Sequence, residues 1–176
     1  MSQNDKIKSF TELGKFLAQF SPNKTTRDAA VKHNDLFFDR FEALIELSPS
    51  HNGWFTPEQV YHAVQSWAEA LTEENLRQWL SAYSEKVEQP KTIGLVLAGN
   101  IPLVGFHDFL SVLVSGHNVL VKTSSNDQKL LPFLAEYLGA VSPEFKNQIT
   151  FTSGQLENYD AVIATGSNNT ARYFEY

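Results

Sequence analysis

The sequence contains no cysteine among its 176 residues. This absence excludes disulfide bonds, thiolate metal sites and a cysteine nucleophile within the chain. The sequence also lacks any apolar run long enough to cross a bilayer, and its first residues lack the pattern of a signal peptide. We therefore expect a cytoplasmic protein without a membrane span.

Basic residues are few: 14 Lys and Arg stand against 20 Asp and Glu, and the net charge is −6. Because nucleic-acid binders usually carry a dense basic patch and this sequence has none, no nucleic-acid partner is expected. The five histidines show no metal-ligand spacing, so no metal site is expected. Apolar residues are plentiful, at 42% of the chain with thirteen Phe, which favours a globular protein with a sizeable core.

The first 90 residues are predicted to form a helical region. Apolar residues recur every three or four positions in several segments, which is typical of amphipathic helices. Thr56, Pro57 and Gln59 are the residue types of a capped helix start, and Thr72 is expected to cap the next helix. The expected elements are helices over 7–20, about 25–47 with Thr25 or Thr26 as cap, 56–70 and 72–83, a loop over 48–53, and Trp54, Trp67 and Trp79 as core or interface anchors.

From residue 91 onward the pattern changes to short apolar runs that alternate with helices. Continuous apolar runs of this length are typical of strands buried on both faces of a parallel sheet. The predicted fold class is therefore α/β: a Rossmann-like parallel sheet flanked by helices, with the helical N-terminal region packed around it. Strands are expected near 92–97, 118–122, 149–152 and 161–165, with one helix opened by Pro102 and another over about 128–140.

Residues 91–176 are interpreted as a partial dinucleotide-binding region that forms one structural domain with residues 1–90. A further helix is expected to begin at Asn168, after a glycine turn. Since an independent domain normally closes its last element, we expect the chain to be incomplete at its C-terminus.

Polar residues follow three of the predicted strands. Asn100 comes after the first strand, Lys122 ends the second, and the turn Thr165-Gly166-Ser167 follows the fourth. Ligands of such sheets bind at the carboxyl ends of the strands, and backbone N–H groups at a helix start attract phosphate. Taken singly, each residue also fits an ordinary turn or a solvated side chain.

Taken together, these segments resemble the cofactor half of the aldehyde dehydrogenase superfamily. They are more similar still to the LuxC-like acyl-CoA reductases, and the resemblance covers residues 91–176. The segments that carry it are Ala98-Gly99-Asn100-Ile101-Pro102, the stretch 115–125 with Val119-Leu120-Val121-Lys122-Thr123-Ser124-Ser125, and Ala164-Thr165-Gly166-Ser167.

The resemblance implies a role for each matching residue. Asn100 matches an asparagine whose side-chain amide stabilises an oxyanion, and Lys122 matches a lysine that contacts the adenosine ribose. Ser125 stands where NAD-preferring members often have Glu, so a 2′-phosphate becomes acceptable and NADPH is the expected cofactor. The residues that match the turn at the pyrophosphate and nicotinamide are Thr165, Gly166 and Ser167.

The implied function is that of the N-terminal part of an NADPH-dependent fatty acyl-CoA reductase. Such an enzyme forms an acyl-cysteine thioester from acyl-CoA and reduces it to the aldehyde. The family's cysteine lies well downstream of these motifs, and this chain has none. The expected partner is an acyl-CoA substrate, and the formation of a homo-oligomer is left open. The alternative is a non-catalytic nucleotide- or CoA-binding module of the same fold.

Overall fold

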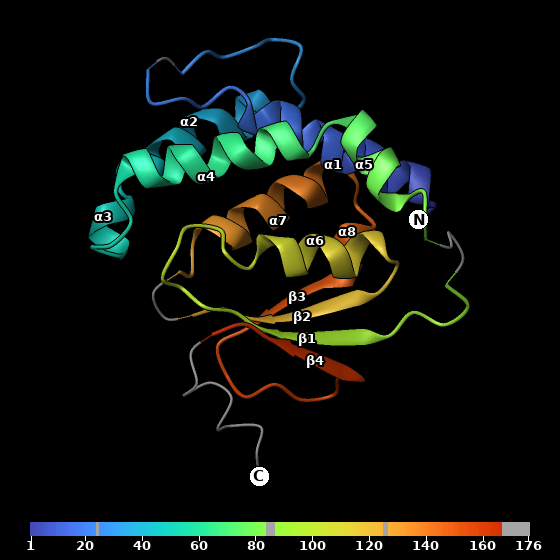
Figure 1. Ribbon diagram of the computed structural model, residues 1–176. Coiled ribbons are helices and arrows are strands. Elements are labelled where there is room, and N and C mark those ends of the chain that lie inside the picture. Colours follow the sequence, from blue (N-terminus) through green and yellow to red (C-terminus); the bar gives the residue numbers. More distant parts are fainter. Residues whose placement is uncertain (24, 84–86, 125–126, 167–176) are drawn as a thin grey trace.

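The structure is a computed structural model, and it describes residues 1–23, 25–83, 87–124 and 127–166. Figure 1 shows two helical layers stacked on one face of a parallel sheet. The outer layer comes from the first half of the chain. Its helices are α1 (Gln3–Leu17), α2 (Asn34–Glu46), α3 (Ser48–His51), α4 (Pro57–Ala70) and α5 (Glu73–Leu80).

The second half of the chain forms the sheet and the inner helical layer. In the described residues the sheet has four strands, all parallel, in the order β3-β2-β1-β4. The predicted α/β class with a parallel sheet and N-terminal helices is therefore confirmed. The elements are β1 (Thr92–Val96), α6 (Phe106–Val114), β2 (Asn118–Lys122), α7 (Leu130–Val141), α8 (Phe145–Gln148), β3 (Ile149–Thr152) and β4 (Ala161–Ala164).

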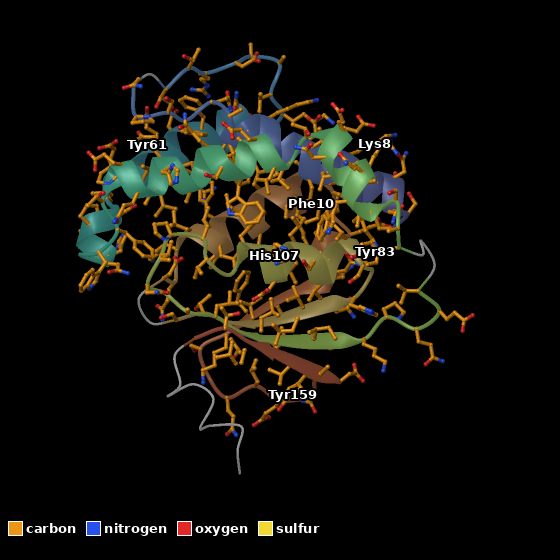
Figure 2. The ribbon with its side chains drawn as sticks, in the orientation of Figure 1. Lys8, Phe10, Tyr61, Tyr83, His107 and Tyr159 are labelled. Carbon is orange, nitrogen blue, oxygen red and sulfur yellow. The ribbon has the colours of Figure 1, made fainter. Side chains whose placement is uncertain are left out.

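The strand order reverses between β1 and β4. The chain moves outward from β1 through β2 to β3 with its helices on one face, and then returns to pair β4 with the other edge of β1. The return segment crosses the opposite face, where Leu156 and Tyr159 lie against Gly94. Figure 2 shows His107 of α6 and Tyr159 on opposite sides of the sheet. The connection from β1 to β2 and the return from β3 to β4 lie on opposite faces and run in opposite directions, and two such crossovers have the same handedness.

The expectation that the strands are buried on both faces is only partly correct. Gly94 and Leu95 in the middle of β1 are buried, whereas Ile163 of β4 is 39% exposed. The reason is that α6 and α7 cover one face, while only an irregular segment crosses the other in the described part of the chain. Of the predicted tryptophan anchors, Trp67 packs against the core, with its ring 4.6 Å from that of Phe106. Trp54 and Trp79 are 80% and 36% exposed and are not core anchors, so for these two only the predicted interface role stays open.

Helix starts follow the predicted capping residues in the fourth and fifth helices. The Thr56 hydroxyl accepts a hydrogen bond from the Gln59 N–H, and the Gln59 side chain accepts one from the Thr56 N–H. The Thr72 hydroxyl likewise accepts from the Asn75 N–H at the start of α5. These reciprocal bonds satisfy N–H groups that a helix leaves without internal partners.

Several predicted boundaries differ from the structure. The first helix spans Gln3–Leu17 rather than 7–20, and the fifth ends at Leu80 rather than 83. The second helix begins at Asn34 rather than Thr25 or Thr26, because the Asn34 amide donates to Gln19 and to the Asp28 carbonyl and so holds residues 25–33 as an irregular loop. Part of the expected loop 48–53 is the short helix α3. Pro102 does not open a helix, since the left-handed Leu103 follows and α6 starts at Phe106. The helix expected from about 128 begins at Leu130.

An aromatic cluster joins the outer helical layer to the inner one. The Phe16 ring stacks on Tyr137 with centroids 4.3 Å apart, and Phe41 stacks on Phe133 at 5.0 Å. The Tyr137 hydroxyl donates to the Lys32 carbonyl at 3.0 Å, so this buried phenol has a partner. Burial raises the pKa of Tyr137 above its ordinary value. Apolar burial of this kind is the main favourable term in folding.

At Gly14, α1 approaches the end of α4 closely, and substitution of this glycine tests the packing. A Cβ at Gly14 would lie 2.8 Å from the Leu71 carbonyl oxygen and 2.9 Å from the Leu71 Cβ. Overlap with backbone cannot be relieved by a rotamer change, so Gly14→Ala should lower the free energy of unfolding by about 1–3 kcal/mol despite the better helix propensity of alanine. Urea denaturation measures the change. Gly53→Ala, which meets nothing within 4 Å, is the control, and equal stability of both variants would contradict the packing.

Candidate functional site

The carboxyl ends of β2, β1 and β4 bring the predicted site residues to one edge of the sheet. Val96, the last residue of β1, pairs with Lys122 on one side and with Ala164 on the other. The Leu97 N–H donates to the Lys122 carbonyl at 3.2 Å, and the Thr165 N–H donates to the Val96 carbonyl at 2.8 Å. Lys122 and Thr165 therefore stand two strand spacings apart, roughly 10 Å.

Lys122 and Thr165 point to opposite faces of this edge. Val119 and Val121 of β2 are buried beneath the helices, so the alternation of side chains along a strand turns Lys122 to the other face. The Thr165 hydroxyl instead reaches α6, where it donates to Oδ2 of Asp108 at 2.6 Å. In the part of the chain that the structure describes, the Lys122 ammonium has no ion pair or hydrogen bond and is available to a ligand.

Asn100 lies beyond β1 in the wall of an open groove. The groove has a volume of about 320 Å³, which is within the lower range of small-molecule sites. One wall is the first two turns of α4 and the other is the turn that follows β1. The Asn100 side chain is exposed and has no hydrogen-bond partner among the described residues. The lining residues are Glu58, Gln59, His62, Ala63, Asn100, Ile101 and Pro102.

The turn that carries Asn100 is fixed by its neighbours and by its own backbone. The buried Asn52 side chain donates to the Gly99 carbonyl at 3.2 Å and accepts from the Trp54 N–H at 3.0 Å. Leu103 adopts a left-handed conformation, with φ of 58°, although its side chain is buried. Such a conformation costs free energy in a residue other than glycine and persists only where the surroundings enforce it.

Asp127 connects this turn to the start of α7. Its carboxylate accepts a hydrogen bond from the Leu130 N–H at 3.4 Å, and the backbone N–H groups of Lys129 and Leu103 lie near enough to lower its pKa. Burial raises the pKa of the Asp127 carboxyl above its ordinary value, and the backbone hydrogen bonds oppose that rise without cancelling it. The same carboxylate therefore ties the loop after β1 to the loop after β2.

The remaining predicted site residues are only partly within the described residues. Gly166 directly follows Thr165 and is exposed at the end of β4. Ser125 and Ser167 lie outside the described residues. The groups that are placed are the Lys122 ammonium and the Asn100 amide, both without a partner among the described residues, and the Thr165 hydroxyl, which Asp108 fixes. This donor and acceptor set fits a ligand that combines phosphate, hydroxyl and amide groups, as a dinucleotide does.

Sequence reasoning missed three side chains that organise the site: Asn52, Asp108 and Asp127. Asn52 belongs to a segment expected to be a plain loop, and Asp108 has the common pattern of an acidic residue in a first helical turn. Asn52 and Asp108 act through partners far along the chain, 47 residues away for Asn52 and 57 for Asp108. No local pattern specifies such partners.

No group of side chains suited to hold a metal ion occurs in the residues covered by the structure. Among those same residues, every helix is too short or too polar to cross a membrane.

The parallel sheet with helices and a reversal of strand order beside β1 places the protein in the class of α/β folds whose ligands bind at the carboxyl ends of the strands. The family model of acyl-CoA reductase (LuxC) matches residues 40–175, and the chain belongs to this family. The match begins inside α2, so it takes in helices for which sequence reasoning found no motif. The fold is consistent with that of the aldehyde dehydrogenases. A comparison with curated proteins finds no match.

The raised pKa of Asp127 gives a pH dependence whose sign can be tested. A carboxyl whose pKa is higher in the folded state contributes stability below its unfolded pKa, near the ordinary value of 3.8, and that contribution is lost as the pH rises through the folded pKa. Wild-type protein should therefore lose unfolding free energy relative to Asp127→Asn as the pH rises from about 3.5 toward neutrality.

Urea denaturation of both proteins across this pH range measures the difference. Asp35→Asn is the control, because it also removes one carboxylate but at an exposed position. A difference that moves in favour of wild type with rising pH would show that hydrogen bonding, rather than burial, dominates at Asp127.

Proposed function

We propose that this chain is the cofactor-binding part of an NADPH-dependent fatty acyl-CoA reductase. The observation that carries the proposal is the placement of Lys122 and Thr165 on either side of β1, at the edge where the strand order reverses. Parallel sheets bind dinucleotides in the crevice at such a reversal. Membership of the acyl-CoA reductase family supplies the reaction class.

Lys122 is proposed to contact the adenosine ribose, and the turn 165–167 to lie against the rest of the dinucleotide. Lys122 can donate to ribose hydroxyls because no carboxylate in the described chain neutralises it. At Ser125 a short hydroxyl, rather than a glutamate, leaves a 2′-phosphate without a like charge, which favours NADPH over NADH. The cofactor, when bound, supplies the hydride for reduction of the acyl group.

Asn100 is proposed to stabilise negative charge on the thioester oxygen. Its amide N–H groups have no partner among the described residues, and the groove beside them is open to a substrate. Donors held in place before the reaction stabilise an oxyanion without reorganisation, and removal of one such donor typically slows catalysis by about 10²–10³-fold. The bonds from Asn52 and Asp127 to this turn supply the rigidity that the role requires.

The second candidate function is a non-catalytic nucleotide- or CoA-binding module. The complete absence of cysteine favours it, since the family reaction passes through an acyl-cysteine and hydroxyl side chains are much weaker nucleophiles at neutral pH. Both candidates require nucleotide binding by this chain. The two candidates differ in one respect. The reductase requires a catalytic cysteine from outside these 176 residues, encoded elsewhere in the gene or supplied by a partner, and the binding module does not.

The first test measures the binding of NADPH to the purified chain, by calorimetry or by quenching of tryptophan fluorescence. Lys122→Ala should weaken NADPH binding about three- to tenfold, because it removes one charge-assisted contact. Lys8→Ala is the matched control: Lys8 is exposed on α1, on the far side of the molecule from the carboxyl edge (Figure 2). Equal loss in both variants would indicate non-specific charge attraction, and no binding by wild type would refute the proposal.

The second test follows the oxidation of NADPH at 340 nm with acyl-CoA substrates of several chain lengths. We expect the 176-residue chain alone to show no acyl-CoA-dependent oxidation, because it contains no thiol to accept the acyl group. A control with NADPH and no acyl-CoA corrects for slow spontaneous oxidation. Turnover by the purified chain would overturn the cysteine-dependent mechanism while leaving the cofactor site in place.

A further inference from the structure

Thr165 is held at both its backbone and its side chain, by two different elements. Its N–H donates to the Val96 carbonyl of β1 at 2.8 Å, and its hydroxyl donates to Asp108 of α6 at 2.6 Å. The second bond is short, as bonds to a carboxylate are. The sheet therefore fixes the position of Thr165, and α6 fixes the direction of its hydroxyl hydrogen.

The Asp108 bond determines what the Thr165 hydroxyl can offer to a ligand. A hydroxyl has one hydrogen and two lone pairs, and an aspartate carboxylate can only accept. Once Asp108 has taken the hydrogen, only lone pairs remain for a ligand. A phosphate oxygen also has only lone pairs to offer, so Thr165 cannot hydrogen-bond it without giving up its bond to Asp108.

We infer that Asp108 is a positioning residue that turns Thr165 into an acceptor, so that Thr165 selects a hydrogen-bond donor of the dinucleotide rather than its pyrophosphate. The donors that a nicotinamide dinucleotide carries are ribose hydroxyls and the carboxamide N–H₂ group. This inference rests on the proposed function and refines it. It assigns the phosphate contacts to other groups of the edge, such as backbone N–H groups, and the recognition of a donor to the Thr165–Asp108 pair.

The surroundings of Asp108 agree with this assignment. Its Oδ2 is occupied by Thr165, while Oδ1 lies 3.7 Å from the Nδ1 atom of His107, a side chain that is mostly exposed. The Asp108 side chain is itself only 23% exposed. A partly buried carboxylate beside a phosphate site would repel the ligand, whereas beside a donor-binding hydroxyl it polarises the hydroxyl and strengthens its acceptor oxygen.

The test compares two variants that remove the same charge. Asp108→Asn keeps an oxygen that can accept the Thr165 hydrogen, and Asp108→Leu keeps the size but removes the acceptor. Because both are neutral, any difference between them reports the hydrogen bond and not the loss of repulsion. The affinity for NADP⁺, measured by calorimetry on the full chain, should be about three- to tenfold weaker for Asp108→Leu than for Asp108→Asn.

A second pair of variants keeps the inference falsifiable if Asp108→Leu does not fold, as judged by circular dichroism. Thr165→Val removes the hydroxyl with little change in shape and should weaken NADP⁺ binding by a similar factor. Thr165→Ser keeps the hydroxyl and should bind within about twofold of wild type.

The source of the donor is distinguished with the 3-acetylpyridine analogue of NADP⁺, in which a methyl ketone replaces the carboxamide. If the carboxamide N–H is the donor, Thr165→Val lowers the affinity for NADP⁺ but not for the analogue. If a ribose hydroxyl is the donor, the variant weakens both ligands equally. Either result supports the acceptor role of Thr165, provided that Asp108→Leu binds NADP⁺ more weakly than Asp108→Asn when both variants fold.

Two results overturn the inference and are distinct from failure of the proposed function. Tighter or equal binding by Asp108→Leu relative to Asp108→Asn would show that the freed hydroxyl donates to phosphate or contributes nothing. Unchanged affinity in Thr165→Val would show that Thr165 does not touch the ligand. Absence of any NADP⁺ binding by wild type would instead refute the proposed cofactor site as a whole, and the inference with it.

Discussion

The position of β1 between β2 and β4 is the constraint on which the candidate site depends. β1 pairs in parallel with both neighbours, so the ends of three strands coincide at one edge. The helices that follow β1 and β2 lie on one face, and the return to β4 crosses the other. In a sheet that continued outward from β3, β4 would pair with β3 and would place no second turn beside the end of β1.

The helical first half of the chain does more than bury apolar surface. Asn52, just after α3, donates to the Gly99 carbonyl and so holds the start of the turn that carries Asn100. The first turns of α4 form the opposite wall of the groove. Since Leu103 is kept in a left-handed conformation within the same turn, the packing around it must supply free energy against that strain. The outer helices are thus part of the structure that fixes the geometry near Asn100.

The strands and the caps of α4 and α5 were predictable because their signals are local. An apolar run followed by small residues indicates a buried strand, and Thr56 with Gln59 forms its reciprocal bonds within one helical turn. The start of α2 was not predictable, because it depends on hydrogen bonds between Asn34 and Gln19 across a loop. The site residues were found at the strand ends by resemblance and position, and their roles remain proposals. The contact of Thr165 with Asp108 depends on tertiary structure alone.

The proposed ligand is an anion, and the chain carries a net charge of −6. The net charge of the protein therefore cannot attract an anionic ligand, and the attraction has to come from cationic groups placed at the site. Exposed charges separated by more than about 8 Å are largely screened at physiological ionic strength, so acidic residues on the outer helices oppose binding only weakly. A cation at the edge itself, unpaired in the described chain as Lys122 is, acts at short range. Asp108 lies too near the candidate site for its charge to be screened from a ligand. Its carboxylate is therefore compatible with an anionic ligand only when the Thr165 hydroxyl, which donates to Asp108, faces a hydrogen-bond donor of that ligand.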